Sequence, residues 1–210
     1  MLSELTDQRR EALQEMINIG FGRSMASLAE LLGVYIELSV PDITSIEGEQ
    51  IFDFLFSSLE GPEDVSLVRQ TFRGQFFGEA VLALSGRAGR ELVVMLGEDS
   101  GFQPALEMNQ LELEALLEVG NVVIGACLGQ FADLLETNLS FNPPVVLMDS
   151  IHSHQAREVL SARPGQALLI RTQFRVDQRA VTGFLMIFLP MECLDWVYRE
   201  VDQFVARVLA

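Results

Sequence analysis

Apolar residues recur every three or four positions in two long stretches of the chain, which predicts two amphipathic α-helices. The first should run from about residue 7 to residue 32, because Thr6 or Ser3 can cap its start and Gly33 can end it. The second should run from residue 108 to about residue 137. The core-facing stripes are Leu13, Met16, Ile17, Phe21, Ser24, Met25, Leu28 and Leu31 in the first helix, and Leu116, Leu117, Gly120, Val123, Ile124, Cys127, Leu128, Phe131 and Leu135 in the second.

Alternating apolar and polar residues predict strands between these helices. One strand is expected after each long helix, at 34–46, with Pro41 near its edge or end, and at 138–151, which also contains proline. Two hairpins are expected, one within 66–85 that turns at Arg73 and Gly74, and one formed by 166–176 and 179–190. Shorter helices are expected at 49–58 and 87–96, a connector at 98–105, a variable insert at 152–165 and a closing helix from residue 191. Strands joined by hairpins pair antiparallel, so the predicted fold is α+β, with an antiparallel sheet and the long amphipathic helices packed on one face.

One segment occurs twice. Residues 11–22 read EALQEMINIGFG and residues 114–125 read EALLEVGNVVIG, so Glu15 and Asn18 recur 103 positions later as Glu118 and Asn121. The strand sequences GEAVLAL (78–84) and GFLMIFL (183–189) match at an offset of 105. We therefore expect a single domain, 1–210, made of two pseudo-two-fold repeats, about 1–103 and 104–210.

The duplicated polar residues share one face of each helix, because positions three and four apart lie on the same side. A glycine inside a helix costs roughly 1 kcal/mol relative to alanine, so a glycine one turn after each asparagine suggests a surface that another molecule approaches closely. The paired positions are Glu11 and Glu114, Glu15 and Glu118, Asn18 and Asn121, Gly22 and Gly125, and, 23 residues after each asparagine, Pro41 and Pro144.

The charge of the chain limits its partners. The formal net charge is −16, and all 14 basic residues are arginine. Such a surface argues against nucleic acid and against an anionic membrane surface, and no membrane insertion is expected. It suits a partner with a basic patch, although an acidic surface kept only for solubility explains the charge equally well.

Other common chemistries find no support in the sequence. Cys127 and Cys193 are too far apart for a metal knuckle, and His152 and His154 form an isolated pair, so no metal site is expected. The chain has no phosphate-binding glycine loop, no dinucleotide fingerprint and no nucleophile turn. It also has no leader-like start and no run of about 20 apolar residues, so a cytoplasmic location is expected.

A carboxylate and an amide on one helical face can act together on a phosphorylated partner. An amide oxygen can hold a water for attack without being a base, because phosphoryl transfer depends mainly on positioning and electrostatics. A carboxylate one turn away can grip a cation on the partner.

With its Glu-x-x-Asn motif and distant proline, present twice, the sequence resembles the CheC/CheX/FliY family of chemotaxis phosphatases. The resemblance implies hydrolysis of the aspartyl-phosphate of a CheY-type response regulator. It implies no cofactor of the chain's own, with Mg²⁺ supplied by the phosphorylated partner. Catalysis would rest on Asn18 and Asn121, which would each orient the attacking water, and on Glu15 and Glu118, which would each engage the receiver's lysine.

One feature departs from the family pattern, which has Asp or Ser where this chain has Glu11 and Glu114. We expect the longer side chain to alter docking without abolishing it. The resemblance also suggests a CheD-type deamidase as a further partner. Two alternatives remain open: a non-catalytic module that docks a receiver domain or a deamidase, and a structural component of the flagellar switch, which is less expected because no appended switch domain is recognised.

Overall fold

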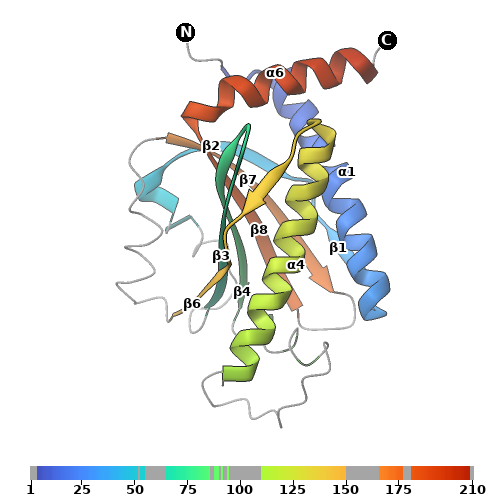
Figure 1. The fold of residues 1–210 in the computed structure, drawn as a ribbon, viewed down its shortest axis with the longest axis vertical. Helices are drawn as coiled ribbons and strands as arrows, with labels where there is room; N and C mark the ends of the chain where they lie inside the picture. Colours follow the sequence, from blue (N-terminus) through green and yellow to red (C-terminus); the bar gives the residue numbers. More distant parts are fainter. Residues whose placement is uncertain are drawn as a thin grey trace.

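The computed structural model describes residues 4–51, 53–54, 65–85, 88–89, 91, 94, 110–149, 166–176 and 181–208. These residues fold as the predicted α+β arrangement, in which three long helices accompany an antiparallel sheet (Figure 1). The helices are α1 (Asp7–Leu32), α4 (Gln110–Leu134) and α6 (Met191–Val208), with a short 3-10 turn, η1 (Gly48–Gln50). The strands are β1 (Ile36–Leu38), β2 (Asp42–Glu47), β3 (Val65–Gly74), β4 (Phe77–Ser85), β5 (Leu139–Phe141), β6 (Val145–Asp149), β7 (Gln166–Val176) and β8 (Val181–Pro190).

The first long helix has the predicted bounds because its caps form as expected. The Thr6 hydroxyl accepts a hydrogen bond from the backbone N–H of Arg9 at 3.3 Å, which satisfies one of the free donors of the first turn. At the other end Gly33 adopts a left-handed conformation, with φ of 64°, and its N–H bonds back to the Glu30 carbonyl.

Each strand that follows a long helix is broken in two, where the sequence predicted one continuous strand. Ser39 to Pro41 separate β1 from β2, and Asn142 to Pro144 separate β5 from β6. Proline has no N–H to donate to a neighbouring strand, so it interrupts the ladder at this point in both halves. The first hairpin also turns later than predicted, since β3 continues through Arg73 and Gly74 and the turn falls at Gln75 and Phe76.

The strand order is β1-β7-β8-β4-β3-β5, with β2 also pairing to β7 and β6 to β3. This order is symmetric. The strands of one half, β1, β2, β7 and β8, occupy the same places as β5, β6, β3 and β4 of the other half, counted from the opposite edge of the sheet. At the centre of the sheet Val81 lies opposite Met186. These two residues are 105 positions apart, which is the offset found in the strand sequences. The sheet is thus symmetric about the contact between β4 and β8, and the division into two repeats stays a prediction.

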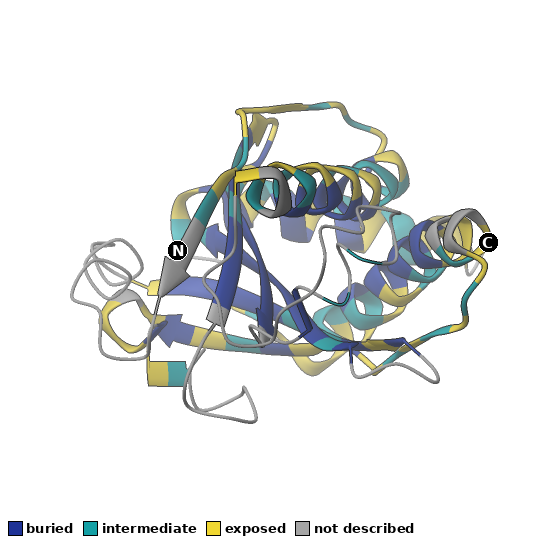
Figure 2. Cartoon of the chain, turned by 90° about the horizontal axis from the view of Figure 1, so that it is seen from below, coloured by how far each residue is buried: buried dark blue, intermediate teal, exposed yellow. Residues whose placement is uncertain are grey.

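All three helices pack on one apolar cluster, which they share with inward-facing strand residues (Figure 2). The two motif helices approach each other closely at Gly20, where an added Cβ would lie 3.4 Å from the backbone nitrogen of Phe131. Within α4, Leu113–Leu134 is long and apolar enough to span a membrane by length and composition. Its apolar side, however, faces this cluster, and Leu116 and Ile124 are fully buried there, as expected of a core helix.

A second buried cluster lies on the other face of the sheet, formed by Ile46, Ile51, Leu67, Val81, Ala83, Leu169, Phe184, Met186 and Phe188. Several predicted segments fall outside the described residues, wholly or in large part. They are the two short helices at 49–58 and 87–96, the connector at 98–105, and the insert at 152–165 with its two histidines. Of the first short helix the structure describes only η1 and three neighbouring positions.

Candidate functional site on the two long helices

The duplicated Glu and Asn side chains point away from the core on both helices. In α1, Glu11, Glu15 and Asn18 are exposed, whereas Met16 and Ile17 between them are fully buried. In α4, Glu114, Glu118 and Asn121 are exposed in the same way, and the core-facing side includes Leu116 and Val119. Both predicted stripes therefore lie where a partner molecule can reach them.

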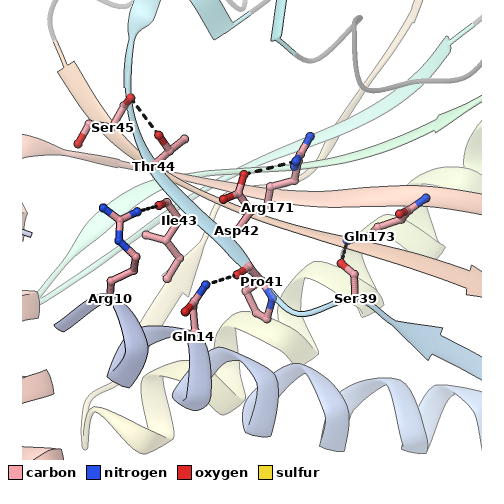
Figure 3. A network of polar contacts seen from close by, with 10 residues as sticks. All are labelled: Arg10, Gln14, Ser39, Pro41, Asp42, Ile43, Thr44, Ser45, Arg171 and Gln173. Carbon is pink, nitrogen blue, oxygen red and sulfur yellow. Dashed lines mark hydrogen bonds and ion pairs between the residues drawn. The ribbon is translucent and has the colours of Figure 1, made fainter. Parts of the chain in front are cut away.

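The motif helix of the first half is tied to the proline segment that follows it (Figure 3). The Gln14 amide donates to the carbonyl oxygen of Pro41 at 2.8 Å, and the Arg10 guanidinium donates to the carbonyl of Ile43. Pro41 is buried, and its segment is also held to β7, where Ser39 and Gln173 bond to each other in both directions at 2.9 Å. The sequence predicted Pro41 as part of the binding face, and the structure places its carbonyl against the helix that carries Glu15 and Asn18.

The second half uses a different contact at the corresponding place. Gln70, on β3, donates one hydrogen bond to the side-chain oxygen of Asn121 at 2.9 Å and another to the backbone carbonyl of Asn142 at 3.0 Å. Pro144, two residues after Asn142, is half-buried. One of the candidate catalytic amides is thus already held by the protein, whereas no hydrogen bond to the Asn18 side chain is found among the described residues.

The two motif glycines have no packing role among the described residues. A Cβ added at Gly22 or at Gly125 would meet nothing within 4 Å. At Gly120, by contrast, an added Cβ would lie 2.3 Å from Cγ1 of Val68, so that glycine is required by the fold. Packing among the described residues therefore does not demand glycine at positions 22 and 125, although glycine weakens a helix there, and both places leave room for another molecule.

Exposed apolar side chains border both motifs. Val40, beside Pro41, is 72% exposed. In the second half Val122 follows Asn121, and Phe141 and Val145 flank the segment 142–144; they are 43%, 36% and 50% exposed. Apolar residues mixed with exposed polar groups are typical of a surface that binds another protein.

Other features of the described residues offer no competing centre. No group of three or more His, Cys, Asp or Glu side chains is placed there to hold a metal ion. Burial raises the pKa of the Cys127 thiol to about 12, so this thiol is protonated and unreactive at neutral pH. A shallow cavity of about 420 Å³ beside Arg9 and Asp202 lies between the start of α1 and the last turns of α6, but these two side chains already form an ion pair at 2.7 Å.

Comparison with known proteins shows which proteins the chain resembles. No family model matches the sequence. The chain is 21% identical over 177 residues to the flagellar motor switch phosphatase FliY of Bacillus subtilis, which covers 83% of this chain and 44% of FliY. It is 25% identical over 146 residues to the CheY-P phosphatase CheC of the same organism, which covers 69% of this chain and 68% of CheC. The chain thus spans under half the length of the first relative and about two thirds of the second.

The fold is that of the same group. A crystal structure of Thermotoga maritima FliY superposes with a TM-score of 0.75 at 16% identity, covering 96% of this chain and all of the other. The middle domain of FliM from H. pylori superposes with a TM-score of 0.63 at 12% identity, covering 93% and 99%. The sequence similarity to CheC and FliY together with this shared fold confirms the CheC-like resemblance predicted from the duplicated motif.

Sequence reasoning missed Gln70, although a signal was present. In LVRQTF the positions of β3 that face inward are Val68, Gln70 and Phe72. Val68 and Phe72 are fully buried, so the polar Gln70 interrupts the apolar pattern of this face of the strand. Such a residue has a hydrogen-bonding partner in most folded proteins. The identity of that partner was not accessible, because Asn121 lies 51 positions further along the chain.

Proposed function

We propose that this chain accelerates the loss of phosphate from a phosphorylated CheY-type receiver domain in the cytoplasm. The observation that carries the proposal is the presence of two exposed Glu/Asn pairs, one on each long helix, each followed by a glycine that packing among the described residues does not require. The similarity to a CheY-P phosphatase and to a flagellar switch phosphatase supports it.

The reaction requires few chemical groups from the chain itself. A water oxygen forms a new bond to phosphorus while the bond between phosphorus and the receiver's aspartyl oxygen breaks. The products are the free aspartate carboxylate and dihydrogen phosphate, which carries both protons of the water. Asn18 or Asn121 orients that water through its amide oxygen and needs no change of protonation state. Mg²⁺ belongs to the phosphorylated partner, and this chain contributes no cofactor.

The carboxylates serve docking. Glu15 and Glu118 lie one turn before each amide, on the same exposed face, where they can pair with a lysine of the receiver. Glu11 and Glu114 extend the acidic stripe by a further turn, and Glu114 accepts a hydrogen bond from Gln110 at 2.9 Å. The chain's net charge of −16 favours approach of a partner whose docking face is basic.

The test follows phosphate loss from a phosphorylated CheY-type receiver, alone and with a substoichiometric amount of this chain. The proposal expects each molecule of the chain to dephosphorylate many receivers. Binding of the receiver without faster decay would contradict catalysis and would favour the non-catalytic docking module. Decay that stops after one receiver per chain would contradict it as well.

A second candidate, a structural component of the flagellar switch, is favoured by the shared fold with the FliM middle domain. It predicts stable co-purification with flagellar basal bodies and no acceleration of phosphate loss. A CheD-type deamidase remains a proposed additional partner, and its test is co-elution with the purified chain on size-exclusion chromatography.

A further inference from the structure

Gln70 holds the second candidate site in a defined orientation, and the described residues show no such support at the first site. Gln70 lies on β3, is 2% exposed and faces the helix layer. Its amide nitrogen carries two hydrogens, and both are used: one bonds to the Asn142 carbonyl and the other to Oδ1 of Asn121. The bridge therefore joins the broken strand β5–β6 to the motif helix α4.

The orientation of both amides follows from one backbone carbonyl. A carbonyl can only accept, so the Asn142 carbonyl requires that Gln70 present its nitrogen rather than its oxygen. That nitrogen then requires Asn121 to present Oδ1, which leaves Nδ2 of Asn121 directed away from Gln70. Asn142 itself is fixed to β3, because its N–H bonds to the Thr71 carbonyl at 3.0 Å and its Nδ2 to the Thr71 hydroxyl at 2.7 Å.

The geometry points to Gln70 as a positioning residue that fixes the rotamer and the amide orientation of Asn121 for the reaction proposed above. With one lone pair of Oδ1 bonded to Gln70, the other lone pair accepts from the attacking water, and Nδ2 is free to donate to a phosphoryl oxygen. A donor on Oδ1 also restricts the side chain before the partner arrives, so less rotational freedom is lost in the reacting complex. This inference rests on the proposed function, but the orientation of the amide can be measured without a substrate.

Burying the Gln70 amide at this position destabilises the fold, which supports a functional reason for it. The Gln70 oxygen is buried and has no hydrogen-bond partner among the described residues. A buried acceptor without a partner is destabilising, and leucine or methionine would fill the same space without that penalty. An amide at this position is therefore explained by its two donated bonds rather than by packing.

The first site is built differently at the equivalent strand position. β3 and β7 occupy equivalent places in the sheet, and their pairing with β5 and β1 aligns Gln70 with Thr172. Thr172 is 2% exposed, and its hydroxyl has no hydrogen-bond partner among the described residues. We therefore expect a held amide at Asn121, an unheld amide at Asn18, and faster turnover at the second site.

The test uses two backgrounds, each with one site left. Asn18→Ala leaves the second site and Asn121→Ala leaves the first. Gln70→Met, which keeps the length of the side chain but removes both donors, should lower kcat roughly tenfold in the Asn18→Ala background, with KM changed much less, and should not change kcat in the Asn121→Ala background. Equal losses in both backgrounds, or no loss in the first, would overturn the positioning role.

A matched control and a direct readout complete the experiment. Thr172→Val, at the aligned position, should leave the rate of the Asn121→Ala protein unchanged, and a loss of rate there would overturn the asymmetry. Nitrogen NMR relaxation of the Asn121 side-chain amide in the otherwise unaltered protein should report a restricted group, which becomes mobile in Gln70→Met, or in Gln70→Leu if the first variant does not fold. An amide equally mobile with and without Gln70 would overturn the inference. If the NMR difference holds but no protein accelerates phosphate loss, the proposed function is wrong, and with it the catalytic part of this inference, whereas the anchoring of Asn121 stands.

Discussion

Replacing Gly125 by alanine should make the protein more stable and less active. The added Cβ meets no described atom within 4 Å, so the folded state suffers no clash. Alanine favours a helix over glycine by about 0.8–1 kcal/mol, and the gain in unfolding free energy should be of that size. For a chain of this length, 1 kcal/mol corresponds to a rise in Tm of roughly 2–4 °C.

The same methyl group would lie on the face that carries Glu118 and Asn121. If a receiver domain packs closely there, an extra methyl costs about 1–3 kcal/mol in the complex, which is a roughly 5- to 150-fold loss in kcat/KM. Gly129→Ala is the matched control. Its Cβ also meets nothing within 4 Å, and it lies on the same helix about 12 Å beyond Asn121 at 1.5 Å per residue.

The assay combines thermal unfolding with the rate of phosphate loss from a phosphorylated receiver. Both alanine variants should raise Tm, and only Gly125→Ala should lower kcat/KM. Equal rates in the two variants would refute the reasoning that Gly125 leaves space for a partner. A lower Tm for Gly125→Ala would refute the premise that the site is open.

Three further predictions concern packing, pH and charge. Gly120→Ala should lower the free energy of unfolding by about 1–3 kcal/mol in chemical denaturation, because its Cβ would collide with Val68; a double variant with Val68→Ala that recovers none of this loss would contradict the assignment. Burial raises the pKa of Cys127 from 9.0 to about 12, so its thiol ionises more readily in the unfolded chain than in the folded protein. Its contribution to the free energy of unfolding is complete below pH 9 and should be lost between pH 9 and 12, by up to about 1.4 kcal/mol per pH unit. Cys127→Ala should remove this pH dependence when unfolding is measured across the same range. Glu15→Lys should weaken receiver binding in low salt, whereas Glu30→Lys, an equal charge change about 22 Å further along α1, should not; equal weakening would mean that net charge and not the motif governs docking.

The helices of the fold could be predicted because their signals are local. Thr6, Gly33 and the buried stripe from Leu13 to Met25 define α1 within one stretch of sequence, and all behave as expected. The interruption at Pro41 was predicted only as the edge or end of a strand. A proline in the sequence shows that one backbone N–H is missing. Whether strand pairing resumes after it depends on the neighbouring strand, here β7, which pairs with both β1 and β2.

The candidate site could be predicted in part for the same reason. Glu118 and Asn121 share a helical face by spacing alone, and the structure leaves that face exposed. The bridge from Gln70 and the open space at Gly125 depend on residues brought together by the sheet, and a single sequence contains no record of such contacts.

The central claim is that two amides do the catalytic work, and removing both tests it most directly. The decay of phosphate from a CheY-type receiver should be measured with the unaltered chain, with the double variant Asn18→Ala/Asn121→Ala, and with Asn138→Ala, which removes another exposed asparagine outside both motifs. The account predicts that the double variant folds, still binds the receiver and leaves the decay at its spontaneous rate, while Asn138→Ala accelerates it as the unaltered chain does. Undiminished acceleration by the double variant would contradict the account.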